Sequence, residues 1–138
     1  MAFTVSAGPS GRSILVRHSR DFDTATARAA AAAVEAFRQA SPPLREAGVV
    51  CDVRGARNVS GLGRNYLFVW HDLPSVGATR TRRVALVRDP GDLSHDFVVA
   101  HLNGAGYDAE VFTDPGAAAE WVEAGSRGVT CRCHELVG

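Results

Sequence analysis

Three short runs of the chain, each followed by a segment with helical spacing of its apolar residues, most constrain the fold. The runs are Gly48 to Val53, Val84 to Val87 and Tyr107 to Phe112. The first two are apolar at nearly every position, which is typical of strands in a parallel sheet whose two faces are covered by helices. Strands that alternate with helices form a mostly parallel sheet through right-handed crossovers. The sequence therefore predicts an α/β fold.

An N-terminal hairpin is predicted ahead of these runs. Phe3 and Val5 stand at alternate positions before the segment of residues 8–11, and Ile14 and Val16 stand at alternate positions after it. That segment reads Gly-Pro-Ser-Gly, and turn-forming residues between two extended runs are typical of a hairpin. The sheet is thus expected to begin with an antiparallel pair.

Four segments are expected to be helices. The first begins after Asp23, whose carboxylate can cap it, and the second spans Leu62 to Leu73. The third begins at Asp92, and the fourth begins at Asp114-Pro115. The residues expected on the inner faces are Ala27, Ala30, Ala31, Val34 and Phe37 in the first helix, Leu62, Tyr66, Val69, Trp70 and Leu73 in the second, Leu93, Phe97, Ala100 and Ala105 in the third, and Ala118, Trp121 and Val122 in the fourth.

Size and charge exclude several classes of function. The 138 residues fit one domain, expected over residues 1–138, and fifteen arginines balance fifteen acidic residues. Without a net charge, nucleic acid and anionic membranes are not expected partners. No apolar run approaches the roughly 20 residues of a membrane span, and no signal-peptide pattern opens the chain. We therefore expect a cytoplasmic protein.

The last thirteen residues contain the only pattern that suggests a metal. Cys131, Cys133 and His134 are suitable zinc ligands, but a fourth ligand is missing from their neighbourhood. We therefore expect no metal, and three cysteines, an odd number, fit reduced thiols. Val129, Cys131 and Cys133 alternate with polar residues, which predicts an added edge strand within residues 126–138.

The tetrad Ser60-Gly61-Leu62-Gly63 places a hydroxyl at the start of the second predicted helix. Unpaired N–H groups and the positive end of the helix dipole would stabilise a phosphate on that serine. A helix-capping hydroxyl requires the same position and residue type, so both interpretations stay open. Asp52 ends the first buried strand, at the edge where open α/β sheets place their sites, or it caps the following loop.

The tetrad after a hydrophobic strand resembles the STAS (anti-anti-sigma-factor) domain, in which a serine followed by Gly-Leu-Gly starts a helix and is phosphorylated by a partner kinase. Asn58 stands where that motif often has aspartate. The start of the first helix, residues 23–27, also resembles STAS domains. The C-terminal half is similar to the wider SpoIIAA-like group, which shares its fold with lipid-carrier domains. The resemblance covers about residues 12–124.

The resemblance implies a single STAS/SpoIIAA-like domain, with an N-terminal hairpin, a mostly parallel sheet and about four helices. It implies a non-enzymatic regulatory module without a cofactor, switched by serine phosphorylation and binding another protein, such as a serine kinase or an anti-sigma-like factor. A homodimer stays open. The residues expected at the phosphoacceptor and partner-binding region are Ser60, Asp52, Asn58, Gly61 and Gly63.

Two alternatives compete with this interpretation. An enzyme would need a nucleophile with its base, paired acids or a phosphate-binding loop, and consecutive helical positions keep the run Ser94-His95-Asp96 from forming a catalytic relay. A carrier of a small, lipid-like apolar ligand is implied by the lipid-carrier relatives. Its candidate lining residues, which are equally typical of a core, are Tyr66, Phe68, Trp70, Phe97 and Trp121.

Overall fold

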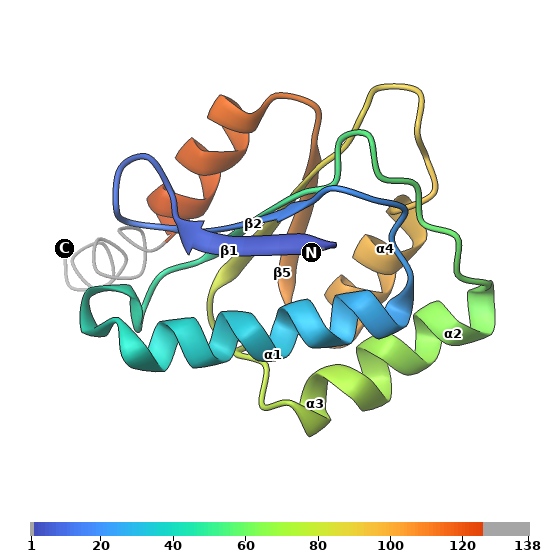
Figure 1. Cartoon of the computed structure of the whole chain (residues 1–138), viewed down its shortest axis with the longest axis horizontal. Helices are drawn as coiled ribbons and strands as arrows, with labels where there is room; N and C mark the ends of the chain where they lie inside the picture. Colours follow the sequence, from blue (N-terminus) through green and yellow to red (C-terminus); the bar gives the residue numbers. More distant parts are fainter. Residues whose placement is uncertain (1, 126–138) are drawn as a thin grey trace, which may run out of the picture.

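The computed structural model describes residues 2–125, which form a five-stranded sheet with helices on both faces (Figure 1). The strands are β1 (Phe3–Ala7), β2 (Ile14–His18), β3 (Val49–Asp52), β4 (Arg83–Val87) and β5 (Asp108–Phe112). The helical elements are α1 (Thr24–Ala40), the short 3-10 turn η1 (Pro42–Leu44), α2 (Leu62–Leu67), the π-helical turn η2 (Phe68–Asp72), α3 (Leu73–Ser75), α4 (Asp96–Gly104) and a further helix over residues 115–125.

The order of the strands in the sheet follows their order in the chain. β1 pairs with β2 in antiparallel fashion, with Val5 opposite Val16, and β2 to β5 are all parallel. The predicted hairpin and the predicted mostly parallel sheet are therefore both confirmed. Because consecutive parallel strands are neighbours, each connection between them needs a single crossover.

The two faces of the sheet are covered unequally. α1, the α2–η2–α3 segment and α4 lie on one face, and the helix of residues 115–125 lies on the other (Figure 1). The larger core, on the first face, includes Phe68, Val98 and Leu86. The smaller core packs Ala118 and Val122 against the strands.

α1 forms as its sequence predicts. The Asp23 carboxylate accepts a hydrogen bond of 2.7 Å from the backbone N–H of Thr26, and this bond and the other backbone contacts hold the pKa of Asp23 below its usual value. Ala27, Ala30 and Val34 are buried against the sheet, as expected.

The predicted inner face of the second helix is partly wrong. Val69 and Leu73 are buried, but Leu62, Tyr66 and Trp70 are exposed. One cause is a buried polar residue, Asn65, which occupies the inner side of α2. The second cause is η2, because a π-helical turn contains more residues than an α-helical turn and shifts the buried face.

The third helix also begins later than predicted. Asp92 accepts hydrogen bonds from the backbone and hydroxyl of Ser94 in a turn, and α4 begins only at Asp96. The later start changes which side faces the sheet: the predicted inner residues Leu93, Phe97 and Ala100 are exposed, whereas Ala105 is buried as expected. The residues of α4 that are buried instead are Val98, Val99 and Leu102.

The C-terminal helix begins where the sequence predicts. Asp114 accepts a hydrogen bond of 3.0 Å from the backbone N–H of Ala117, and Pro115 is the first helical residue. Among residues 2–125, no helix has both the length and the apolar character that a membrane span requires. The strand predicted within residues 126–138 lies outside the described residues, as do Cys131, Cys133 and His134.

Candidate functional site

Ser60 lies in the loop between β3 and α2, where two helices begin. Its hydroxyl accepts a hydrogen bond of 3.0 Å from the backbone N–H of Thr24, the first residue of α1. Gly61, rather than Ser60, is the residue that directly precedes α2. The half-buried hydroxyl therefore caps α1, which is not the helix that the sequence predicted.

Asn58 holds this loop in place. Its side-chain amide donates to Oδ1 of Asn65 at 3.1 Å, and its Oδ1 accepts from the backbone N–H of Ser60 at 3.0 Å. The backbone N–H of Asn58 donates to the hydroxyl of Ser94 at 2.9 Å. Because Asn58 and Asn65 are both buried, these bonds are sheltered from water. The position of Ser60 thus depends on Asn58, Asn65 and Ser94.

Sequence reasoning missed Asn65 and Ser94. A usable signal for Asn65 was present, because it stands three residues after Leu62 and four before Val69, at the helical spacing of the predicted inner face. Ser94 had no comparable signal, since its partner is 36 positions away in the chain.

Gly61 and Gly63 form the exposed edge of the loop. Neither has a positive φ, and a Cβ added to either would meet no atom within 4 Å. The fold therefore does not require glycine at either position, although glycine within a helix is destabilising relative to alanine. Because glycine has no side chain, another chain can approach the backbone closely at these two positions.

We expect Gly63→Ala to raise the free energy of unfolding by about 0.5–1 kcal/mol, because alanine loses less backbone entropy and has room for its methyl group. Urea unfolding measures the change. Gly106→Ala is the control: Gly106 has a φ of 97°, so alanine there should destabilise the chain. A destabilised Gly63→Ala variant would show that the loop itself needs this glycine.

The structure separates Asp52 from the rest of the predicted site. Side chains alternate along β3, and Asp52 lies beside Val50 and Pro115, on the face covered by the helix of residues 115–125. The loop of Ser60 contacts α1, on the opposite face. Asp52 therefore does not adjoin the Ser60 hydroxyl.

Asp52 is fully engaged with two arginines. Its carboxylate accepts three hydrogen bonds from Arg54, at 3.1, 3.0 and 2.9 Å, and Nη2 of Arg17 lies 3.4 Å away. Burial opposes ionisation of Asp52, but the hydrogen bonds from Arg54 and the two positive charges outweigh it, so its pKa lies below the usual value. The Asp52 carboxylate is therefore a partner in structural ion pairs with Arg17 and Arg54 rather than a free acid.

A strip of apolar and aromatic side chains adjoins the loop on its outer side. We call Leu62, Tyr66, Trp70, Phe97 and His101 the aromatic strip. The first four are 66, 50, 45 and 41% exposed. The Tyr66 ring lies 6.1 Å from Trp70 and 5.4 Å from His101, and His101 lies 4.5 Å from Phe97, between ring centroids. The strip therefore runs continuously from α2 to α4.

The aromatic residues considered for an apolar-ligand carrier do not form one cavity. Tyr66, Trp70 and Phe97 belong to the exposed strip, and Trp121 lies on the other face of the sheet, beside Phe112. Trp121 packs against the smaller core there, and Phe68 is buried in the larger core.

The run Ser94-His95-Asp96 carries no catalytic geometry. The Ser94 hydroxyl donates a hydrogen bond to Asp92, and Asp96 forms an ion pair with Arg88. His95 is completely buried, and its Nε2 lies 2.7 Å from the carbonyl oxygen of Ala56. In the described part of the chain, no three histidine, cysteine or acidic side chains are grouped so as to hold a metal ion.

The fold and the site define a small α/β domain with a five-stranded, mostly parallel sheet and a serine loop next to an exposed aromatic strip. Comparison with family models, with curated proteins and with solved structures finds no match for this chain.

Proposed function

We propose that the chain is a non-enzymatic regulatory module that binds another protein through the Ser60 loop and the aromatic strip. The observation that carries this proposal is the exposure of the strip directly beside the loop. Monomeric proteins rarely expose large contiguous apolar patches, and aromatic residues are enriched at protein interfaces. Leu62, which is two residues after Ser60, joins the two parts of this surface.

The proposed switch is a phosphate on Ser60. It would add about two negative charges beside the first N–H groups of α1, which favour an anion. The same charge would lie at the edge of an apolar contact surface, where it opposes the burial that binding requires. A partner that fits the free hydroxyl would therefore release the phosphorylated protein.

The resemblance of the Ser60 tetrad to STAS domains supports the same role, and we propose membership of the STAS/SpoIIAA-like group on that basis. The sequential order of the strands is compatible with this assignment at the level of the α/β class. The proposed partner is a serine kinase or an anti-sigma-like factor.

Affinity purification from the source organism tests the proposal, with intact-mass analysis of the recovered chain. Wild type and Ser60→Ala should retain the same protein, and Ser60→Asp should bind that purified protein about tenfold more weakly. Part of the wild type should carry the mass of one phosphate, and Ser60→Ala should not. The control is Ser6→Asp, which adds the same charge at an exposed position of β1.

Equal affinity of Ser60→Asp and Ser6→Asp for the partner would refute the switch. Recovery of only a second copy of this chain would make the homodimer the partner and would refute a kinase or anti-sigma-like factor in that role.

A further inference from the structure

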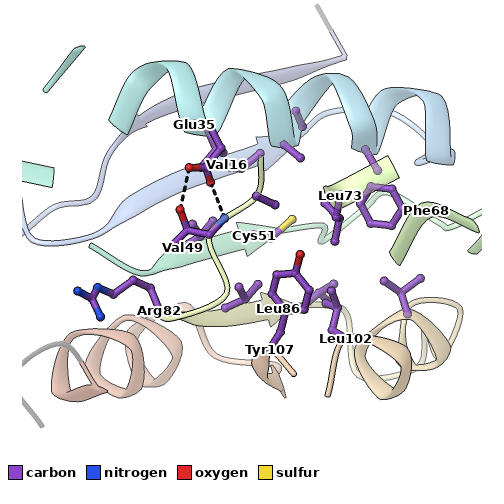
Figure 2. Close-up of a pocket in the computed structure, with 18 of the residues that line it drawn as sticks. Val16, Glu35, Val49, Cys51, Phe68, Leu73, Arg82, Leu86, Leu102 and Tyr107 are labelled. Carbon is purple, nitrogen blue, oxygen red and sulfur yellow. Dashed lines mark hydrogen bonds between the residues drawn. The ribbon is translucent and has the colours of Figure 1, made fainter. Parts of the chain in front are cut away.

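A cavity of about 130 Å³ lies between the inner face of α1 and the sheet (Figure 2). It exists because α1 presents small side chains there: Ala27, Ala30 and Ala31 all line it, opposite Val16 and Leu86 of the strands. Protein interiors contain few voids larger than a water molecule, and an engineered apolar cavity of about 150 Å³ binds benzene. The cavity therefore has the size of a single-ring organic molecule.

Four buried polar atoms of residues that line this cavity have no hydrogen-bond partner among the described residues. Two are Nε atoms of Arg38 and Arg82, whose guanidinium groups pair with carboxylates at one end of the cavity. The other two are the hydroxyl of Tyr107, which is 6% exposed, and Nδ1 of His18, which is 3% exposed. Figure 2 shows the Tyr107 hydroxyl pointing across the cavity toward Cys51. Buried polar groups are normally paired, and an unpaired one is costly. A polar group on a bound molecule would supply the missing partner.

The charges around the cavity indicate an uncharged ligand. At its half-buried end, Glu35 accepts a hydrogen bond of 2.9 Å from the Thr79 hydroxyl (Figure 2). Glu35 also lies 3.4 Å from Nε of Arg38. Arg82 lines the same end and pairs with Glu46. Each guanidinium already has a carboxylate partner, so neither needs a negative charge from a ligand.

We propose that the cavity binds a small, uncharged, single-ring molecule that carries one hydroxyl group, with that hydroxyl paired to the hydroxyl of Tyr107. Such a ligand is much smaller than a lipid. Phe22 lines the cavity and is hydrogen-bonded through its backbone to Arg57 and Val59, just before Ser60. Neither the Ser60 hydroxyl nor the aromatic strip lines the cavity, so the test of this site does not depend on the proposed protein-binding role.

Titration of the full chain with phenol, benzene and benzoate tests the site. Binding is detected as changes in the NMR chemical shifts of the backbone amides of residues that line the cavity. We expect phenol to bind about tenfold more tightly than benzene, because one hydrogen bond is added in a buried site. Benzoate should not bind. Tyr107→Phe should lower the affinity for phenol about tenfold and leave that for benzene unchanged, since it removes only the hydroxyl.

A matched pair of variants on α1 locates the binding. Ala31→Leu fills the cavity and should abolish binding of phenol and benzene, whereas Ala32→Leu, on the exposed side of α1, should preserve it. Three outcomes would each overturn the proposal: no cavity shifts with phenol or benzene, tighter binding of benzoate than of phenol, or a preference for phenol that Tyr107→Phe leaves unchanged.

Discussion

Lowering the pH from 7 to 5 is expected to reduce the free energy of unfolding by about 2 kcal/mol through His18 alone. Burial and, to a smaller extent, the nearby His95 together lower the pKa of this histidine from 6.5 to about 4. Below pH 6.5 the unfolded chain therefore gains a proton that the folded chain does not. The stability that His18 contributes is complete above pH 6.5 and is lost as the pH falls toward 4.

The packing around His18 explains this effect. Its ring lies 4.9 Å from that of Phe22, and Phe22 lies 5.1 Å from His95 on its other side, between ring centroids. Burial also lowers the pKa of His95, so that residue adds a loss of the same sign. The pKa values of Asp23 and Asp52 lie below their usual range, so these groups titrate below pH 5. The loss of stability between pH 7 and pH 5 therefore comes from the buried histidines.

Urea unfolding at pH 7 and pH 5 measures the loss for wild type and for His18→Phe, which keeps an aromatic ring in the stack but cannot bind a proton. The variant should lose about 2 kcal/mol less than wild type between the two pH values. His71→Phe is the control, because that side chain is 75% exposed and should not alter the loss. Identical losses in His18→Phe and wild type would refute this account of the buried stack.

Asn58→Ala is expected to lower the free energy of unfolding by about 3 kcal/mol. The change leaves Oδ1 of Asn65 and the backbone N–H of Ser60 without their partners in a buried loop. Each unpaired buried group costs about 1–3 kcal/mol, and part of that cost is recovered where water can reach the loop. We also expect faster hydrogen exchange at the amide of Ser60.

The control for this variant is Asn103→Ala. The side chain of Asn103 makes two hydrogen bonds of 2.9 Å to the backbone of Ala109, but Asn103 is exposed, so water can replace them. Its loss should be about 1 kcal/mol. If urea unfolding gives the same loss for both variants, burial of Asn58 does not determine how firmly the Ser60 loop is held.

The sheet and two helices were predictable because their signals are local. The apolar runs set the parallel strands, the turn residues set the hairpin, and Asp23 and Asp114 capped the helices they precede. The inner faces of α2 and α4 were not predictable from apolar spacing. A buried Asn65 lies on the inner side of α2, and α4 begins only after the buried His95, later than the sequence predicts.

The sequence predicts Ser60, Asn58, Gly61 and Gly63 for the candidate site, but it does not predict the contacts that hold them in place. The tetrad identifies Ser60, but the partner of its hydroxyl is Thr24, which is 36 positions away and is fixed by the tertiary fold. The sequence groups Asp52 with Ser60 because Asp52 ends β3 and Ser60 lies in the loop that follows it. The alternation of side chains along that strand directs Asp52 to the other face.

The central claim is that the Ser60 loop and the aromatic strip contact another protein. A photo-reactive amino acid placed at Leu62 tests it most directly in cells of the source organism, with Ala32 on the exposed side of α1 as the control position. We predict a discrete cross-linked protein from position 62 that is absent from position 32. No cross-link at position 62, or the same products from both positions, would contradict the claim.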